Sequence, residues 1–561
     1  MMTDGPQRRR HAVQRNRKKI RDVSAASPVP EQVWSQTAAR RTIGLSLLGL
    51  LAAGILAGFV LQIGNSDSGG FDEIVAQAVT RLSQADEARV REICSHCHRL
   101  PTPDVLPRSA WEDTIWEMFR ESGYGTTVKW GVDPSSVVAW YEERAPEQFT
   151  FPVTDESREP DGLPLDKRTI ASHPSPAPRV VSNILVANVV GDEHPEILVC
   201  DMFNGQILMG RTSEPDWHLE PVAEVPNPAH VEAVDLDADG RIDLVVASLG
   251  SYLAMDHNLG GVEWLRQRED GTFERSTLAD GLGRVADVQP DDFDGDGDLD
   301  LVVAEFGWHT TGHLLLLENN TLPGQPAEFD VREIDGLHGA SHVDVVDLDG
   351  DGLRDIVALY SQGHEMVRCY LQKGKFVFTV HDLYRAPSPT WGFSGSQLLD
   401  LDQDNDLDIL LTNGDTFDNS LLKPYHGIQW LENQGELQFV PHQLGTLFGA
   451  YRAAATDLDG DGDADVVACA LIAPSAQGMH LSDRKLDSLV WFEQVAAGEF
   501  VRHTLESDQC HHPTLTLSDY DLDGDVDLLV GNGQLHFTVA PSERSCLDLW
   551  ENKRNPQADA P

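Results

Sequence analysis

The sequence predicts a mainly β fold: a seven-bladed β-propeller, preceded by a small all-α domain and an N-terminal transmembrane helix. Three observations predict this fold. An acidic motif occurs six times between residues 235 and 527, an apolar strand follows every copy, and residues 43–63 form an uncharged apolar run. Repeats that each contain several short strands are typical of radially stacked blades. The 561 residues leave room for one large domain and at least one small one.

The acidic motif reads Asp-x-Asp-x-Asp, with a fourth Asp four residues after the third. The six copies contain Asp235, Asp237, Asp239 and Asp243; Asp292, Asp294, Asp296 and Asp300; Asp347, Asp349, Asp351 and Asp355; Asp400, Asp402, Asp404 and Asp408; Asp457, Asp459, Asp461 and Asp465; and Asp519, Asp521, Asp523 and Asp527. The last Asp recurs at steps of 57, 55, 53, 57 and 62 residues. A degenerate copy from Asn188 to Glu196 raises the count of repeats to seven.

Each repeat reads as four strands. In the repeat that starts at His230, the strands are expected around residues 230–234, 244–247, 261–265 and 273–278. The chain ends after a third strand near Leu549, whereas residues 165–170 have the character of a fourth strand. We therefore expect the N-terminal strand to close the last blade, which removes the open edges that a ring would otherwise expose.

The spacing of the aspartates suits calcium, because side chains at loop positions 1, 3, 5 and 9 and a backbone carbonyl at position 7 can surround one ion with oxygen. The alternative is that the aspartates only cap turns. The degenerate first copy lacks two of the four carboxylates, so we expect no metal there. The loops resemble the FG-GAP or VCBS repeats of integrin α-chain propellers over residues 165–553. The resemblance implies a seven-bladed propeller with structural calcium, and it does not imply adhesion.

The charge of the chain is unevenly distributed. The formal net charge is −49, yet residues 1–42 form a basic leader with ten Arg or Lys against three acids. The apolar run 43–63 is long enough to span a bilayer, and the basic flank before it predicts a cytoplasmic N-terminus with the rest of the chain periplasmic or extracellular. A cleavable signal peptide is the competing interpretation. Outside the leader there is no basic surface that would suit nucleic acid.

A second motif follows the apolar run. Cys94-Ser-His-Cys97-His98 matches Cys-x-x-Cys-His, the attachment sequence of c-type haem, in which two thiols bind the porphyrin and the His ligates iron. A redox Cys-x-x-Cys or half of a zinc site are the alternatives, but residues 99–172 contain no further Cys or His. Residues 71–150 resemble a single-haem cytochrome c domain, with helices expected over 73–93, from Trp111 to about Glu121, and near 134–144.

The resemblance to cytochrome c implies a sixth iron ligand. Met118 is the only Met between residues 3 and 201 and is the candidate, although it lies only 20 residues after His98. An open sixth position, with Met118 in the core, is the alternative. Residues 151–164 form a polar linker to the propeller. The sequence leaves open whether Cys510 and Cys546, which belong to one repeat, form a disulfide.

Histidines gather on one expected face of the propeller. If the acidic loops join strands one and two, then the entry to strand one and the loop between strands two and three lie on the opposite face. Eleven of the 21 histidines fall there. Seven residues, one per repeat, are expected around the central channel: Asn183, His230, Asp287, His342, Gly395, Arg452 and Thr514. The further histidines expected on this face are His257, His309, His313, His364, His426, His480, His511, His512 and His536.

Among the residues expected around the channel, the catalytic candidates are His230, Asp287, His342 and Arg452. A His could act as a base or metal ligand, Asp287 as an acid or ligand, and Arg452 as an anion clamp. The alternative is that imidazoles in loops only satisfy backbone groups. No spacing identifies a reaction, so the sequence leaves open whether the protein is an enzyme.

Two function classes follow from these features. The first is a membrane-anchored periplasmic electron-transfer protein, in which haem c serves a calcium-stabilised propeller that binds a small substrate or a redox partner. A dehydrogenase that passes electrons to haem falls in this class. The second is a ligand- or matrix-binding propeller, as in integrins, whose haem serves sensing.

Overall fold

The computed structural model describes residues 87–95, 98–121, 133–152 and 163–554, with short gaps at 176, 215, 323–324, 326, 477–484 and 534–544. All described residues belong to one compact unit. Among the described helices, none is long and apolar enough to cross a membrane. The basic leader 1–42 and the predicted span 43–63 lie outside the described residues.

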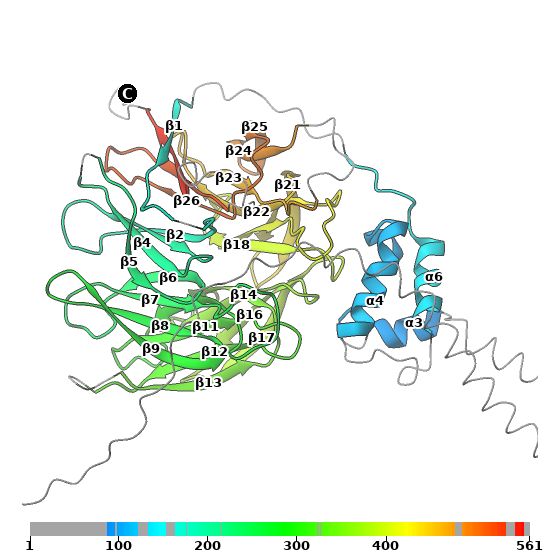
Figure 1. The fold of residues 1–561 in the computed structure, drawn as a ribbon, viewed down its shortest axis with the longest axis horizontal. Coiled ribbons are helices and arrows are strands. Elements are labelled where there is room, and N and C mark those ends of the chain that lie inside the picture. Colours follow the sequence, from blue (N-terminus) through cyan, green and yellow to red (C-terminus); the bar gives the residue numbers. More distant parts are fainter. Residues whose placement is uncertain are drawn as a thin grey trace, which may run out of the picture. The chain divides into compact units, whose positions relative to one another are not determined.

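The described part of the chain contains seven four-stranded antiparallel sheets, which are the blades of a propeller (Figure 1). Blades one and two comprise β2 (Val181–Ala187), β3 (Glu196–Asp201), β4 (Gln206–Arg211) and β5 (Glu220–Glu224), then β6 (Pro228–Val234), β7 (Asp243–Ser248), β8 (Gly260–Gln267) and β9 (Phe273–Leu282). Blades three and four comprise β10 (Val285–Asp291), β11 (Asp300–Glu305), β12 (His313–Asn319) and β13 (Phe329–Asp335), then β14 (Ala340–Val346), β15 (Asp355–Tyr360), β16 (Met366–Gln372) and β17 (Phe378–Arg385).

The last three blades include the one that closes the ring. Blades five and six comprise β18 (Phe393–Leu399), β19 (Asp408–Asn413), β20 (Gly427–Asn433) and β21 (Phe439–Thr446), then β22 (Ala450–Thr456), β23 (Asp465–Ala470), β24 (Asp487–Ala496) and β25 (Glu499–Ser507). Blade seven comprises β26 (Thr514–Ser518), β27 (Asp527–Gly531), β28 (Leu547–Asn552) and β1 (Leu165–Ile170). The N-terminal strand β1 pairs with β28 from Leu165–Asn552 to Ile170–Leu547, which confirms the expected closure.

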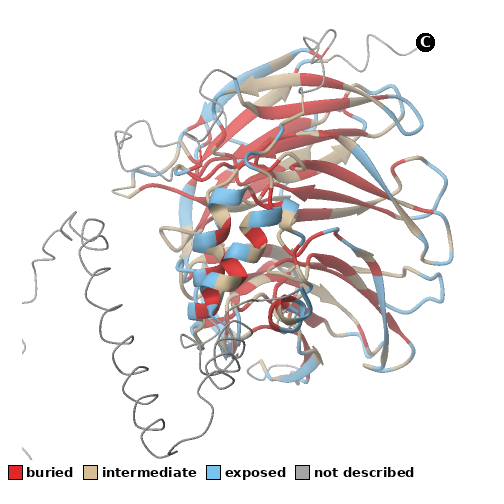
Figure 2. Ribbon diagram, turned by 90° about the vertical axis from the view of Figure 1, so that its right-hand side faces the viewer, coloured by how far each residue is buried: buried red, intermediate tan, exposed pale blue. Residues whose placement is uncertain are grey.

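The core of the propeller lies between neighbouring blades. The second strand of every blade is buried along its whole length, and the fourth strands of blades two to four are largely exposed (Figure 2). This burial explains why the apolar run after each acidic motif is continuous, because a strand covered on both faces needs apolar side chains at every position. Residues Leu244 to Ala247 of β7, for example, are all 0% exposed.

The helical segment comprises α3 (Glu87–Cys94), α4 (Trp111–Glu121) and α6 (Pro134–Arg144), with short 3-10 helices η1 (Pro103–Val105) and η2 (Arg108–Ala110) before α4. The expected helices at 111–121 and 134–144 are confirmed, and the first is described only from Glu87. Asp133 caps α6 by accepting a hydrogen bond from the backbone of Ser135, and Pro134 occupies its first turn. Trp111 and Tyr141 stack at 3.8 Å in the core of this segment.

The six described cysteines are all buried free thiols, so no disulfide joins Cys510 and Cys546. In the structure these two residues lie in different apolar clusters, Cys510 with Ile472 and Cys546 with Leu547. The thiol of Cys510 contacts Ser488 and the backbone of Leu486 and Asp487 instead.

Candidate functional site

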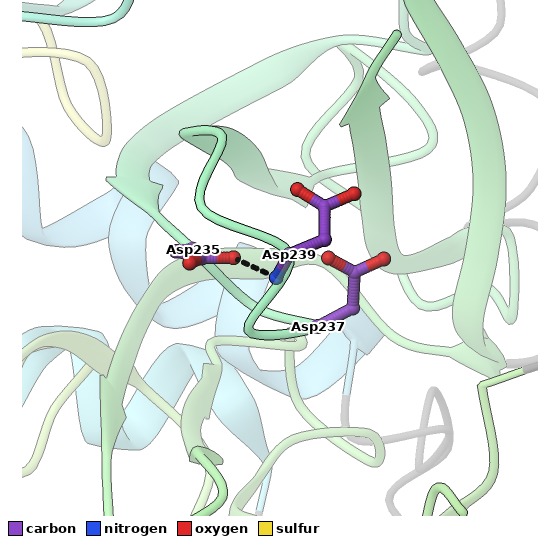
Figure 3. Close-up of side chains that lie close together, drawn as sticks. All are labelled: Asp235, Asp237 and Asp239. Atoms are coloured by element: carbon purple, nitrogen blue, oxygen red, sulfur yellow. Dashed lines mark hydrogen bonds between the residues drawn. The ribbon is translucent and has the colours of Figure 1, made fainter. Parts of the chain in front are cut away.

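The acidic loops join the first and second strands of blades two to seven, and each closes on its own backbone. Asp235 accepts hydrogen bonds from the backbone N–H groups of Asp239 at 3.0 Å and Gly240 at 2.9 Å, and the carboxylates of Asp235, Asp237 and Asp239 converge (Figure 3). Gly240 has a φ of +86°, which favours glycine. In the fifth blade Asn405 occupies this position with a φ of +74°.

The same convergence recurs in the other loops. Ligand atoms that lie within 4.8 Å of one another come from Asp292, Asp294 and Asp300; Asp347, Asp349 and Asp351; Asp400, Asp402 and Asp404; and Asp457, Asp459 and Asp461. With the loop of blade two included, the structure therefore brings the first three aspartates together in four loops, and the first, second and fourth in the loop of blade three.

The fourth Asp of each loop has a structural role that sequence reasoning missed. Asp243 accepts hydrogen bonds from the backbone N–H of Gln267 at 2.7 Å and from the indole of Trp264 at 2.9 Å, so it fixes the loop to the third strand. Asp527 accepts the corresponding bond from Asn552 at 2.8 Å. In blade one Glu196 bonds the backbone of its own loop instead. The recurring Asn or Gln at the end of strand three was the available sequence signal.

The electrostatics of the loops suit a divalent cation. Burial and neighbouring carboxylates raise the pKa of Asp243 to about 6, of Asp300 and Asp465 to about 7, and of Asp527 to about 8. Asp465 and Asp527 are each 1% exposed, and one oxygen of each is buried without a hydrogen-bond partner in the described part of the chain. Oxygen donors of this kind fit calcium, which would occupy the unsatisfied positions.

Basic side chains divide the six loops into two classes. Arg266 lies 2.5 Å from Asp237, and Lys375 lies 2.5 Å from Asp294. Lys373 lies 2.6 Å from Asp349 and 2.9 Å from Asp351. In blades five to seven, no Lys or Arg among the described residues forms an ion pair with a loop carboxylate. In blades two to four, a Lys or Arg side chain therefore competes with a bound cation for the loop carboxylates.

On the opposite face, three of the four catalytic candidates form a chain of ion pairs across three blades. His230 of β6 lies 3.4 Å from Asp287 of β10, and Asp287 lies 2.7 Å from Nδ1 of His342 on β14. Asp287 is 1% exposed and also accepts the backbone N–H groups of Val288 and Val343. Both of its oxygens are therefore fully used.

Opposite charges in this chain stabilise one another. Burial opposes ionisation of Asp287, but His230 and His342 hold the pKa of its carboxyl well below the usual range. Burial also opposes protonation of His230, yet Asp287 and Glu232 outweigh it and raise the pKa of His230 to about 9. Glu232 accepts a hydrogen bond from His230 Nε2 at 2.7 Å. The amide nitrogen of Asn183 lies 3.2 Å from Nδ1 of His230, and a hydrogen bond in this direction needs a neutral imidazole with a lone pair on Nδ1. With the amide group rotated by half a turn, the amide oxygen of Asn183 would accept a hydrogen bond from the protonated imidazole.

Arg452 of β22 completes the set of catalytic candidates. Its positive charge interacts with His230 and with Asp344, which belong to other blades. The Arg452 side chain lies over Gly395, and a Cβ added at Gly395 would be 3.2 Å from Cδ of Arg452. No carboxylate among the described residues lies within ion-pair distance of it. The structure therefore gathers His230, Asp287, His342 and Arg452 around the channel.

Other histidines of this face have mainly structural surroundings. His426 is 0% exposed, and burial lowers its pKa well below the usual value. His512 is 1% exposed and bonds both Asn532 and Glu506. His338 and His364 lie 4.7 Å apart between ring centres, and each has one buried nitrogen without a partner in the described residues. His480 and His536 lie outside the described residues.

In the helical segment, the second candidate site surrounds Cys94 and His98, and Cys97 lies outside the described residues. The Nδ1 of His98 donates a hydrogen bond to the backbone oxygen of Arg99 at 2.7 Å, which leaves Nε2 as the lone-pair nitrogen. Cys94 is buried, and burial raises the pKa of its thiol to about 11. Met118 packs against the core that contains Cys94.

The helical segment contacts the propeller within the same compact unit. Arg99 donates a hydrogen bond to the backbone oxygen of Ala386, and a Cβ added at Gly363 would lie 3.4 Å from Cβ of His98. The Phe151 and Phe448 rings meet edge to face at 5.4 Å. Ala386, Gly363 and Phe448 all lie in loops opposite the acidic loops. His98 and Arg99 therefore contact the propeller on the face that carries the channel residues.

Comparison with known families agrees with the architecture. Residues 235–303 and 347–411 match the family model of the FG-GAP-like repeat. The protein is a seven-bladed β-propeller with FG-GAP-like repeats. The repeats that sequence reasoning identified are thereby confirmed.

Curated protein sequences gave no match. Among solved structures, BBS1N in complex with ARL6DN is similar in two crystals, soaked with mercury or lead, at 12% and 11% identity with TM-scores of 0.40 and 0.38. Each match covers 70% of this chain and 97% of that chain. An ancestral GH74 enzyme is similar at 10% identity and a TM-score of 0.43, over 67% of this chain and 48% of that one. Similarity at this level supports no conclusion about function.

Proposed function

We propose that this protein is a membrane-anchored c-type cytochrome that transfers electrons to or from a substrate or partner bound by its propeller. The observation that carries the proposal is the motif Cys94-x-x-Cys97-His98, in which His98 donates through Nδ1 to a carbonyl. A proximal histidine needs this tautomer, because Nε2 must present its lone pair to iron.

Haem c would be held by thioethers from Cys94 and Cys97, with His98 as axial ligand and Met118 as the proposed sixth ligand. The iron would supply one-electron redox chemistry. Two features of the chain support a role for the propeller. Gly363 and Ala386, which contact the haem-binding segment, lie on the face that carries His230, Asp287, His342 and Arg452. This arrangement would shorten the path between a bound substrate and the haem.

Calcium is proposed as the second cofactor, bound by the six acidic loops. The buried, partnerless oxygens of Asp465 and Asp527 support it, because an unsatisfied carboxylate is costly in the absence of a cation. On this proposal calcium is structural and lies on the face away from the redox chemistry. Membrane anchoring through residues 43–63, with the bulk of the chain in the periplasm, is proposed from the sequence alone.

The optical spectrum of protein produced with covalent haem maturation tests the proposal. We expect a pyridine haemochrome typical of two thioethers, and a reduced spectrum that carbon monoxide does not change if Met118 ligates the iron. The Cys94→Ala variant should lose one of the two thioethers, and its haemochrome band should shift. Cys369→Ala, at a buried propeller cysteine, should leave the haemochrome band unchanged. Purified protein without covalent haem would refute the cytochrome assignment.

A ligand- or matrix-binding propeller with a haem used for sensing remains the second candidate. The repeat architecture favours it, since integrin α-chains carry similar repeats. An iron that binds carbon monoxide, together with no haem reduction by a panel of sugars, alcohols and hydroxy acids, would favour this candidate over electron transfer.

A further inference from the structure

Two histidines on the face opposite the acidic loops form a close pair. His338 lies in the connection from β13 to β14, and His364 lies in the loop between β15 and β16. Their ring centres are 4.7 Å apart, and the rings are tilted by 48°. Nδ1 of His338 and Nε2 of His364 are both buried without a hydrogen-bond partner in the described part of the chain. Because a buried polar atom without a partner is unfavourable, the pair points to a ligand.

The backbone beside the pair forms a tight turn with unusual geometry. The backbone N–H of His364 donates to the oxygen of Ser361 at 3.3 Å, and Gln362 and Gly363 occupy the two central positions. Their φ angles are +54° and +84°, and the left-handed conformation is unfavourable for a glutamine. Ser361 donates its own N–H to the oxygen of Gly339 at 2.9 Å, which joins the turn to the connection between blades three and four. Backbone strain of this kind is typical of functional sites.

Glycines leave space for the pair and bring a third donor atom near it. A Cβ added at Gly312 would lie 2.9 Å from the Cβ of His338, so a larger residue there would displace the histidine. Oε1 of Gln362 is also buried without a partner among the described residues. A Cβ added at Gly339, the residue after His338, would lie 3.1 Å from the Cβ of Gln362. Three donor atoms without partners therefore come from two adjoining backbone segments.

The charge and spacing of the two imidazoles suit a transition metal. Burial lowers the pKa of both, to about 4 for His364, so both are neutral at neutral pH and offer lone pairs. Arg368 and Arg385 also act on His364, but both are paired with Asp382, at 2.7 and 2.6 Å. A Zn–N distance of about 2.0–2.1 Å places two imidazoles on a tetrahedral ion with their ring centres roughly 5 Å apart, close to the observed 4.7 Å.

We propose that His338 and His364 bind a borderline transition-metal ion such as Zn²⁺ through Nδ1 and Nε2, with water or Oε1 of Gln362 completing the coordination. This inference goes beyond the proposed function, because it adds a metal site that uses neither the acidic loops nor the haem motif. A hard cation such as Ca²⁺ fits less well, since it prefers oxygen ligands. A Cβ added at Gly363 would lie 3.4 Å from the Cβ of His98, so the ion would fix the turn that the haem-binding segment contacts.

Calorimetric titration of the full chain with Zn²⁺, in excess calcium to occupy the acidic loops, tests the proposal. We expect one Zn²⁺ site that His338→Asn and His364→Asn each weaken about a hundredfold, because even an outer partner of a metal ligand contributes roughly 10–100-fold in affinity. The matched control is His381→Asn, at an exposed histidine of β17 in the same blade as His364, and it should bind Zn²⁺ as wild type does. Titration with Mg²⁺ should show no binding at this site.

Two results would overturn the proposal. The first is wild-type protein without saturable Zn²⁺ binding, or with binding that both variants retain at full affinity. The second is Zn²⁺ binding that is lost in His98→Asn but persists in His338→Asn and His364→Asn, because the ion would then belong to the Cys-x-x-Cys-His motif.

Melting temperatures and the haem spectrum separate the inference from folding defects and from the cytochrome assignment. Zn²⁺ should raise the melting temperature of wild type but not of the two variants, and all three should melt alike in a chelator. His364→Gln, which keeps a polar side chain, replaces His364→Asn if that variant does not fold. Zn²⁺ binding at the pair without covalent haem would refute the cytochrome alone, whereas covalent haem without Zn²⁺ binding would refute only this inference.

Discussion

Asp527→Asn is expected to stabilise the propeller in the absence of calcium and to stabilise it less in calcium. The side chain of Asp527 is buried, it accepts a hydrogen bond from Asn552, and its second oxygen has no partner in the described residues. An asparagine can keep the bond to Asn552 but carries no charge. The substitution therefore isolates the effect of the charge from that of the hydrogen bond.

The sign in the metal-free protein follows from the pKa. Burial and the neighbouring carboxylates raise the pKa of Asp527 to about 8, whereas an unfolded Asp titrates near 3.9. Ionised Asp527 therefore destabilises the folded state increasingly as the pH rises from about 4 to about 8. At pH 7.5 in a chelator, removal of the charge should raise the free energy of unfolding by roughly 2–4 kcal/mol.

In calcium this gain should shrink. The variant loses one charged ligand, and a tenfold loss of affinity at saturating calcium subtracts about 1.4 kcal/mol from the gain in the free energy of unfolding. Urea denaturation at pH 7.5, with calcium and with chelator, measures both changes. Asp280→Asn, at an exposed position of β9, is the control and should change neither. Equal shifts of Asp527→Asn in both conditions would refute the assignment of this loop as a cation site.

Three further predictions follow from the ion pairs and the ring closure. Lys373→Gln should tighten calcium binding in the loop of blade four several-fold, as measured by calorimetry, because Lys373 competes for Asp349 and Asp351; no change would contradict the two loop classes. His230→Gln should lower the free energy of unfolding below pH 6.5, because Asp287 and Glu232 raise the pKa of His230 in the folded protein. The difference between wild type and variant should fall by about 2 kcal/mol as the pH rises through 9. A difference that stays constant in denaturant titrations between pH 6 and 10 would exclude the ion pair. A chain that starts at residue 174 should melt well below one that starts at residue 160, because only the second retains β1; equal melting temperatures would show that closure is dispensable.

The frame of the propeller could be predicted from the sequence because its signals are local. Each loop carries its own aspartates, and each second strand follows directly as an apolar run. Residues 165–170 read as a fourth strand without a repeat of its own, and the last repeat lacked a fourth strand. Helix α6 could also be predicted from the sequence, since Asp133 and Pro134 mark its start. These features depend on residues that are close in sequence.

The candidate site was harder to predict because it depends on distant residues. The sequence suggested His230, Asp287 and His342 by their equivalent positions, but the hydrogen bonds among them depend on strand register in three blades. His426 shows a related limit, because a loop position gave no indication that packing buries it completely.

Because β1 pairs with β28, the ring of blades can close only after β28 has been synthesised. Thr169 of β1 donates a hydrogen bond to Asp548 of β28, 379 residues further along. During synthesis β1 emerges early and has to wait, unpaired, until β28 has been added. Contacts between such distant segments form slowly, and unpaired strand edges promote aggregation in the meantime. A prematurely terminated chain can never close, so it leaves an exposed edge that quality-control proteases and chaperones can recognise.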